Sequence, residues 1–280
     1  MKRQIDPNKP KIKLPSGGKY LQTKETVEKF GLHTICQSGN CPNLAECWKA
    51  GTATFMILGD ICTRSCKFCS VITGKPLPPD EDEPMHVAES IRHMRLKHCV
   101  ITSVDRDDLP DGGALHWAKT IETIKKINPL TTIEVLIPDF HGKTEYIDKV
   151  LRANPNIISH NLETVERLTP SVRSVAKYRR SLEVLAYIAQ NGVTPKSGIM
   201  LGLGETKEEI IQTMDDLLNV GCKIITIGQY LQPAKENLPV LKFYSSEEFK
   251  ELEIIAKVKG FDFVESGALV RSSYHAEKHV

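Results

Sequence analysis

Six of the eight cysteines in this 280-residue chain fall in two close groups of three. The groups are Cys36, Cys41 and Cys47, and then Cys62, Cys66 and Cys69. A structural zinc site takes four ligands and disulfides use cysteines in pairs, whereas three thiolates on an iron–sulfur cube leave one iron open. Two groups of three therefore favour two iron–sulfur clusters, each with one corner available to another ligand.

Composition narrows the class of protein. The chain is 40% apolar and 26% charged, and it has no apolar run as long as a membrane span. Its N-terminus is basic but leads into no apolar stretch, which argues against a secretory signal. Clustered cysteines without such a signal predict metal ligands in a reducing compartment, so we expect a cytoplasmic protein with no membrane partner. A formal charge of +2 is too small to predict nucleic-acid binding.

The first twenty residues are nevertheless locally basic. The plainer interpretation of this segment is a solvated, flexible arm, and the functional one is a patch that steers an acidic protein partner. The cations concerned are Lys2, Arg3, Lys9, Lys11, Lys13 and Lys19.

After the cysteine groups, apolar runs rich in β-branched residues alternate with segments of helical period. The expected strands are 53–58, 99–104, 132–137, 156–160, 195–201 and 223–228. The expected helices are 85–97, 115–128, 145–153, 181–191 and 207–220. Continuous apolar runs are typical of parallel strands buried on both faces. Six β/α units are too few to close an eight-stranded barrel, so we expect an α/β fold, a partial (β/α)6 TIM-like barrel with its active site at the carboxyl ends of the strands.

We expect this partial barrel to occupy residues 51–230. An N-terminal extension, residues 1–50, carries the first cysteine group, and a C-terminal extension covers residues 231–280. Capping-box spacing also predicts two helix starts. These spacings are Thr206 with Glu209, and Ser245 with Glu248.

The second cysteine group begins just after the first expected strand. With Phe68 before its last cysteine it reads C-x3-C-x-F-C, which resembles the motif of the radical S-adenosylmethionine superfamily. The resemblance implies a 4Fe–4S cluster on Cys62, Cys66 and Cys69 whose open iron binds S-adenosylmethionine, the source of a 5′-deoxyadenosyl radical. The alternatives are a zinc knuckle and unrelated buried thiols.

Other segments agree with this resemblance. Residues 198–205 follow the fifth-strand pattern G-x-I-x-G-x-x-E of the superfamily, with Met200 in place of the isoleucine. A glycine-rich strand end is also common turn chemistry, and Asn161 and Glu163 are equally suited to capping the next helix. The usual Gly-Gly-Glu form is missing beside residues 102 and 103. The residues expected to bind the cofactor are Phe68, Thr102, Ser103, Asn161, Glu163, Gly198, Gly202 and Glu205.

The first cysteine group is not a feature of the whole superfamily. Its C-x4-C-x5-C spacing, together with the Arg-Ser-Ser-Tyr segment at 271–274, resembles the lipoyl synthase family over nearly the whole chain. The resemblance implies that Cys36, Cys41 and Cys47 hold an auxiliary 4Fe–4S cluster, with Ser273 as its fourth ligand, and that this cluster donates sulfur. Taken alone, the tetrapeptide is more simply a surface turn. An alkoxide is a harder ligand than a thiolate and matches iron–sulfur clusters poorly, so it would leave readily.

The family resemblance also implies a reaction, the insertion of two sulfur atoms at carbons 6 and 8 of a protein-bound octanoyl-lysine. No side-chain base can deprotonate those carbons, so Ser273 is the one side chain assigned to the chemistry itself. The implied carriers are lipoyl domains of 2-oxoacid dehydrogenases and the glycine cleavage H protein, with a ferredoxin or flavodoxin as electron donor. The competing functions are a methylthiotransferase, a ferredoxin-like electron carrier and a zinc-stabilised binding module.

Overall fold

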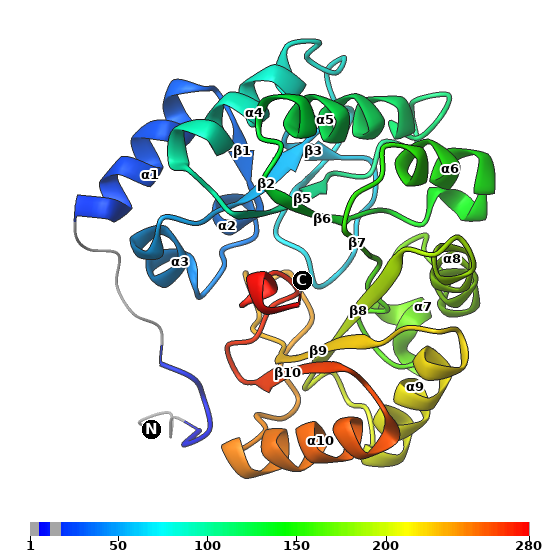
Figure 1. Ribbon diagram of the computed structural model, residues 1–280. Helices are drawn as coiled ribbons and strands as arrows, with labels where there is room; N and C mark the ends of the chain where they lie inside the picture. The colour runs from blue at the N-terminus through cyan, green and yellow to red at the C-terminus, as the bar shows by residue number, and fades with distance from the viewer. Residues whose placement is uncertain (1–5, 12–17, 280) are drawn as a thin grey trace.

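The computed structural model describes residues 6–11 and 18–279, and its central feature is one curved sheet with helices on its outer side (Figure 1). The strands follow the order β1-β2-β5-β6-β7-β8-β9-β10. Neighbours from β2 to β10 pair in parallel, and β1 pairs antiparallel to β2. The bounds are β1 His33–Thr34, β2 Thr54–Ile57, β5 His98–Ser103, β6 Thr132–Leu136, β7 Ile157–Ser159, β8 Thr194–Leu201, β9 Ile224–Gln229 and β10 Phe263–Gly267.

The expected α/β partial barrel is confirmed, with one more parallel strand than the sequence predicted. The six expected strands are β2, β5, β6, β7, β8 and β9. The seventh, β10, comes from the segment expected to be a C-terminal extension, and it pairs with β9. It escapes a search for buried apolar runs because it is a partly exposed edge strand, in which Phe263 is 41% exposed and Glu265 lies in the middle. The division of the chain at residues 50 and 230 remains a prediction.

Helices cover the sheet because their apolar residues recur on one side. In α5 the buried residues Trp117, Ala118, Ile121 and Ile124 follow the spacing of a single helix face. Five helices overlap the expected ones. Their bounds are α4 Glu83–Met94, α5 Ala114–Ile127, α6 Thr144–Arg152, α8 Tyr178–Gln190 and α9 Lys207–Asn219.

Both expected capping boxes are confirmed. The Thr206 hydroxyl accepts from the backbone N–H of Glu209, whose carboxylate accepts from the N–H of Thr206, and this pair begins α9. Ser245 and Glu248 make the same two bonds at the start of α10 (Ser246–Lys259). Each box satisfies two backbone donors that a helix start otherwise leaves without partners.

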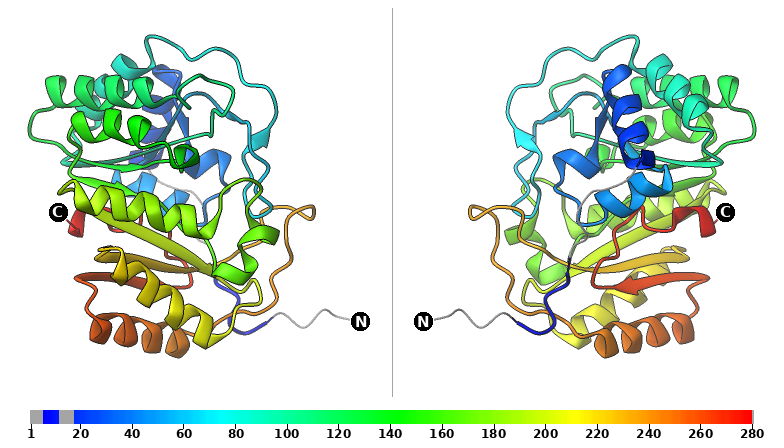
Figure 2. Two further views of the ribbon diagram at one scale, coloured as in Figure 1. Left: turned by 90° about the vertical axis from the view of Figure 1, so that its right-hand side faces the viewer. Right: turned by 90° about the vertical axis from the view of Figure 1, so that its left-hand side faces the viewer.

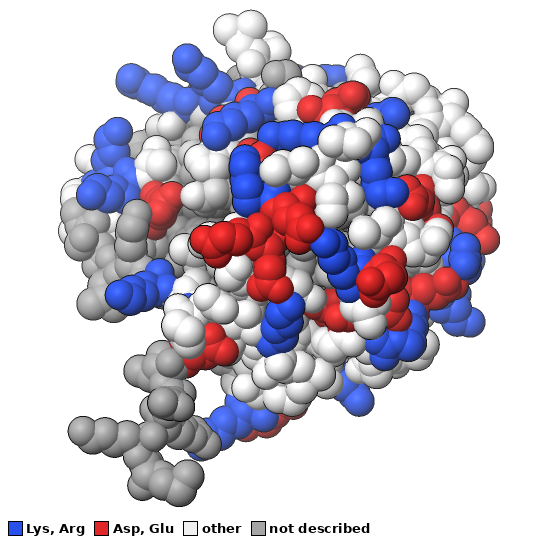
Figure 3. All heavy atoms as spheres, turned by 90° about the horizontal axis from the view of Figure 1, so that it is seen from below, with Lys and Arg blue, Asp and Glu red and all other residues white. Residues whose placement is uncertain are grey.

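Charged residues of both signs share the face that carries α10. Figure 3 shows Lys and Arg interspersed with Asp and Glu on this face. On α10 itself, Lys250 and Lys257 both pair with Glu253. Among the basic N-terminal residues, Lys9 and Lys11 are exposed, whereas Lys2, Arg3 and Lys13 lie outside the described residues. No helix within the described ranges is both long and apolar enough to cross a membrane.

The segment before β2 lies at the β1 edge of the sheet and beside α4, whereas the segment after β10 returns to the inner side of the sheet (Figure 1). The helices before β2 are α1 Gly18–Lys29, α2 Ile35–Ser38 and α3 Leu44–Ala50. They pack through Trp48, which is fully buried and lies 5.4 Å from the ring of Tyr20. After β10 the tail returns to the middle of the curved sheet, where the short helix η3 (Ala276–Lys278) contacts β5 (Figure 1).

Candidate active site

The second cysteine group lies on the loop that follows β2, at the carboxyl ends of the parallel strands. Cys62 closes the short strand β3 (Ile61–Cys62), and Cys66 and Cys69 follow on the loop that leads to β4 (Ile72–Thr73), the parallel partner of β3. Backbone N–H groups donate to two of these sulfurs, from residue 64 to Cys62 at 3.4 Å and from residue 71 to Cys69 at 3.5 Å. Such donors stabilise the thiolate, which is the form that binds metal.

Burial keeps the thiols of Cys62 and Cys69 protonated in the absence of metal. Desolvation, with the charge of Asp105 adding to it, raises the pKa of Cys62 to about 12. Desolvation likewise raises the pKa of Cys69 to about 11. The third sulfur, of Cys66, lies 3.7 Å from the Ser174 hydroxyl. Metal binding must displace the protons of Cys62 and Cys69, so assembly of a cluster here depends on pH.

The loop between β9 and α10 covers the cysteine loop, and Figure 2 shows both loops at the same end of the molecule. Asn237 Nδ2 donates to the carbonyl oxygens of Lys67 at 3.1 Å and of Cys69 at 2.9 Å. The N–H of Leu238 donates to the carbonyl of Lys67 at 3.2 Å. Phe68 packs against a small apolar cluster beyond the ends of β8 and β9. These contacts fix the cysteine loop, and a direct contact of Phe68 with a cofactor remains a prediction.

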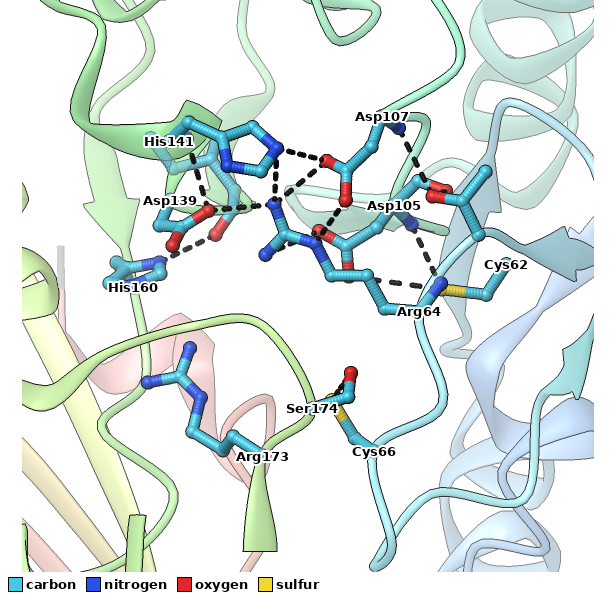
Figure 4. A network of polar contacts seen from close by, with 12 residues as sticks. Cys62, Arg64, Cys66, Asp105, Asp107, Asp139, His141, His160, Arg173 and Ser174 are labelled. Atoms are coloured by element: carbon cyan, nitrogen blue, oxygen red, sulfur yellow. Dashed lines mark hydrogen bonds and ion pairs between the residues drawn. The ribbon is translucent and has the colours of Figure 1, made fainter. Parts of the chain in front are cut away.

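Arg64, between the first two cysteines of this group, binds three carboxylates (Figure 4). Its guanidinium lies 3.3 Å from Asp105, 2.7 Å from Asp107 and 2.9 Å from Asp139. Despite burial, the charge of Arg64 lowers the pKa of Asp139, whereas burial raises the pKa of Asp105. Because these carboxylates follow β5 and β6, Arg64 ties the cysteine loop to two strand ends.

Two residues expected to bind the cofactor carry polar atoms that are buried and lack hydrogen-bond partners within the described residues, Ser103 Oγ and Asn161 Oδ1. Such atoms are costly to bury and mark places where a ligand can bind. Asn161 Nδ2 donates to Glu163 Oε1 at 3.1 Å, and Glu163 adopts a left-handed φ of 67°. The hydroxyl of Thr102 instead donates to the carbonyl of Leu136 at 3.3 Å, which occupies its hydrogen atom.

The glycines of the 198–205 segment lie where a side chain does not fit. A Cβ on Gly198 would lie 2.5 Å from Thr226 Oγ1, and a Cβ on Gly202 would clash with Gln229 Nε2. The carboxylate of Glu205 accepts from the N–H of Gly202 at 2.6 Å and from the N–H of the next residue at 2.9 Å. Glu205 therefore holds the turn that carries Gly202, and its contact with a cofactor remains a prediction.

The first cysteine group and Ser273 line the same cavity of about 840 Å³. Cys36 lies in α2, Cys41 in the following turn and Cys47 in α3. Burial raises the pKa of Cys36 to about 11 and, with repulsion from the other two thiols, the pKa of Cys47 to about 12. Within the described residues, no three His, Cys, Asp or Glu side chains converge as a single metal ion requires. The donors fit a cube, where each soft thiolate takes a separate iron.

Ser273 reaches this cavity because the C-terminal tail is held by the residues around the cysteines. The hydroxyl of Thr54, at the start of β2, donates to Ser273 Oγ at 2.9 Å. Asn43 Nδ2, between the second and third cysteines, donates to the carbonyl of Leu269 at 2.6 Å. The segment at 271–274 is therefore a half-buried turn that forms part of the cavity wall.

The residues beside Ser273 also contact the first cysteine group. The Tyr274 hydroxyl donates to Glu46 Oε1 at 3.2 Å, next to Cys47. Burial raises the pKa of Cys41, and the positive charge of half-buried Arg271 opposes this rise. A cation here would offset the negative charge of a thiolate-bound cluster.

Three residues at these sites were not singled out from the sequence. The role of Arg64 could have been predicted from the sequence, since a cation inside a cysteine loop needs carboxylate partners and the acidic segment at 105–108 offers them. Asp139 also follows a strand and shares that edge of the sheet. No sequence pattern predicts the role of Thr54, because that role depends on a tail more than two hundred residues away.

Known proteins resemble this chain in sequence and in fold. The family model described as the radical SAM superfamily matches residues 56–217. Lipoyl synthase of Bacteroides fragilis (strain YCH46) is 61% identical over 279 residues, covering 100% of this chain and 97% of that protein. Lipoyl synthase of Flavobacterium psychrophilum is 58% identical, covering 96% of this chain and 93% of that protein.

Among solved structures, methylornithine synthase (PylB) superposes with a TM-score of 0.55 at 13% identity, covering 78% of this chain and 72% of that one. Coproporphyrinogen III oxidase (HemN) of Escherichia coli, a radical SAM enzyme, gives a TM-score of 0.52 at 12% identity, covering 72% of this chain and 51% of that one. These two likenesses concern the fold alone. The sequence relatives, whose matches cover 96–100% of this chain, show that it belongs to the lipoyl synthase family of the radical SAM superfamily.

Proposed function

We propose that this chain inserts two sulfur atoms at carbons 6 and 8 of an octanoyl-lysine on a lipoyl carrier protein. Membership of the lipoyl synthase family makes it a sulfurtransferase that uses S-adenosylmethionine and 4Fe–4S clusters. The observation that carries the proposal is the single cavity lined by Cys36, Cys41, Cys47 and Ser273. This arrangement brings a hydroxyl from the end of the chain to a cysteine group near its start.

When bound, S-adenosylmethionine and the two clusters supply the radical that breaks C–H bonds and the sulfur that replaces hydrogen. The chain supplies the ligands and their positions. We assign Cys62, Cys66 and Cys69 to the cluster that binds the cofactor. The remaining cofactor contacts are assigned to Phe68, Thr102, Ser103, Asn161, Glu163, Gly198, Gly202 and Glu205. The free Ser103 Oγ and Asn161 Oδ1 support this assignment most directly.

We assign Cys36, Cys41, Cys47 and Ser273 to the auxiliary cluster, the sulfur donor. Ser273 is the catalytic residue in this proposal because its hard oxygen leaves iron more readily than a thiolate does. Its hydrogen bond from Thr54 keeps the side chain beside the cavity when it is not bound to metal.

The family acts on octanoylated carrier proteins. We propose lipoyl domains of 2-oxoacid dehydrogenases and the glycine cleavage H protein as carriers, and a ferredoxin or flavodoxin as electron donor. All eight cysteines are free thiols. Free thiols suit a reducing compartment, and we propose that this is the cytoplasm.

The test is anaerobic incubation of the reconstituted chain with S-adenosylmethionine, reductant and an octanoyl-lysine peptide. Mass spectrometry should show the gain of two sulfurs, with about two equivalents of 5′-deoxyadenosine per product. Before the reaction, analysis should find about eight iron and eight sulfide ions per chain. The Ser273→Ala variant is expected to cleave S-adenosylmethionine without yielding the two-sulfur product. Cleavage by the intact chain without any gain of sulfur would contradict the proposal.

A further inference from the structure

A fully buried ion pair lies inside the barrel, and neither of its residues lines the cavity of the first cysteine group. Lys196 on β8 and Glu134 on β6 are each 0% exposed. Lys196 Nζ lies 2.8 Å from Glu134 Oε1 and 2.9 Å from Oε2. The Ser159 hydroxyl on β7 donates to Glu134 Oε1 at 2.9 Å. Strands β6, β7 and β8 are neighbours, so three adjacent strands hold this pair in place.

The third N–H of the Lys196 ammonium forms a hydrogen bond with the C-terminal tail. His279 Nδ1 lies 3.2 Å from Lys196 Nζ. An ammonium group only donates, so Nδ1 must be the unprotonated nitrogen of the ring. Burial and the charge of Lys196 lower the pKa of His279 to about 4, which leaves the ring neutral near pH 7. Two bonds to Glu134 and one to His279 thus use all three donors of Lys196.

His279 is the last described residue of the tail that carries Ser273. It is 6% exposed, and Ala276 between them is 1% exposed. Before Ser273, the tail is held by Asn43 through the carbonyl of Leu269, and directly after Ser273, Tyr274 donates to Glu46. Those two partners lie among the first cysteines, so their positions depend on a loop that a cluster would cross-link. The contact with Lys196 depends instead on strands, as does the hydrogen bond from Thr54 on β2 to Ser273 itself.

We propose that Lys196, oriented by Glu134, is a positioning residue that anchors His279 and so keeps Ser273 beside the first cysteine group while that group lacks its cluster. The inference rests on the proposed role of Ser273 as a cluster ligand. If Ser273 is to bind again after the cluster has been rebuilt, the tail that carries it must keep its position while the cluster is absent.

His279 is the residue to change, because removing Lys196 or Glu134 would leave an uncompensated buried charge and risk unfolding. His279→Leu removes the acceptor and fills a similar volume. His279→Asn keeps an acceptor close to the position of Nδ1. Lys278→Ala is the matched control, an exposed residue of the same segment.

The first measurement is hydrogen exchange of residues 268–278 in the full-length chain without clusters. His279→Leu should exchange roughly fivefold to tenfold faster than the unaltered chain, the change expected when one buried hydrogen bond is lost. His279→Asn should restore most of the protection, and Lys278→Ala should match the unaltered chain. Equal exchange in all four proteins would overturn the proposal.

The second measurement follows iron uptake in a background where Cys62, Cys66 and Cys69 are alanine, so that about four irons per chain report the first group alone. His279→Leu should take up this iron several times more slowly, with rescue by His279→Asn. Unchanged uptake in His279→Leu would also overturn the anchor. Ser273→Ala in the same background tests the ligand role separately. If Ser273→Ala keeps a normal cluster, the proposed ligand role of Ser273 fails, whereas the exchange result still reports on the anchor.

Discussion

The hydroxyl of Thr54 donates a 2.9 Å hydrogen bond to the hydroxyl of Ser273, although 219 positions separate the two residues. Thr54 also hydrogen-bonds the Cys36 thiol, which partly offsets the rise in the pKa of that thiol caused by burial. One strand residue thus contacts both the first cysteine and the hydroxyl proposed to complete its cluster. A rigid strand can therefore hold that hydroxyl in place while the cysteine loop moves.

Thr54→Val should loosen Ser273 from the first cysteine group. Valine has nearly the same shape but no hydroxyl, so the chain without clusters should lose about 1 kcal/mol of its free energy of unfolding. The reconstituted variant should lose iron from the auxiliary site to a chelator several times faster than the unaltered chain, as followed by absorbance. Thr54→Ser keeps the hydroxyl and serves as the control. An equal rate of iron loss in the valine variant would show that the hydrogen bond does not hold Ser273.

Ser273→Cys should keep the auxiliary cluster but impair sulfur insertion. A thiolate holds iron more tightly than an alkoxide does, so this corner should open less readily. Iron and sulfide content should stay near that of the unaltered chain, while the yield of the two-sulfur product falls at least about tenfold relative to 5′-deoxyadenosine. Full product yield from this variant would refute the proposed role of the serine oxygen.

Arg64→Met should destabilise the chain strongly, because half-buried Asp105 and buried Asp139 both lose this cation, although Arg180 still lies 3.1 Å from Asp139. Breaking a buried pair costs about 3–5 kcal/mol, which urea unfolding of the protein without clusters should detect. Adding Asp139→Asn should recover part of this loss, since it removes one uncompensated charge. A loss below about 1 kcal/mol in the single variant would mean that solvent or Arg180 compensates the carboxylates.

Ser103→Ala and Thr102→Val should separate a ligand-binding hydroxyl from a structural one. Ser103 Oγ is buried without a partner among the described residues, so its removal should leave the free energy of unfolding nearly unchanged and raise the KM for S-adenosylmethionine. Thr102 donates to the carbonyl of Leu136, so its loss should cost about 1 kcal/mol of stability. The reverse pattern would exclude Ser103 as a cofactor contact.

Stability without clusters should fall between pH 6.5 and 4. Burial, with the charge of Arg173 adding to it, lowers the pKa of His160 from 6.5 to about 4. The unfolded chain therefore binds a proton in this range that the folded chain does not, so the stabilisation is complete above pH 6.5 and is lost as pH falls toward 4. His160 alone contributes roughly 3 kcal/mol to this loss.

Buried His98 and His279, whose pKa values are also lowered to about 4, add to the same decline. Urea unfolding at a series of pH values checks the total. His160→Gln removes one titrating group, so its stability should decline less steeply than that of the unaltered chain. An identical slope in both proteins would rule out His160 as a source of the pH dependence.

The sequence predicted the barrel well because each strand of the inner sheet is a local run of apolar residues. Strands such as β5 and β9 are buried along nearly their whole length, so pattern and burial coincide. The edge strand β10 was missed because one side of it faces solvent and its residues are partly exposed. Both capping boxes were predictable because each needs only residues three positions apart.

The expected cluster ligands could likewise be predicted from short stretches of sequence, namely the spacings within each cysteine group and the motif around Phe68. Only the folded chain decided what surrounds those ligands. The hydrogen bond from Thr54 to Ser273, the carboxylates around Arg64 and the bond from Lys196 to His279 join residues far apart in sequence. Such pairs leave no periodic or spaced pattern, because their geometry comes from the curvature of the sheet and the return of the tail. The two groups of three cysteines therefore predict two clusters from the sequence alone. Only the tertiary structure places the Ser273 hydroxyl beside the first of these groups.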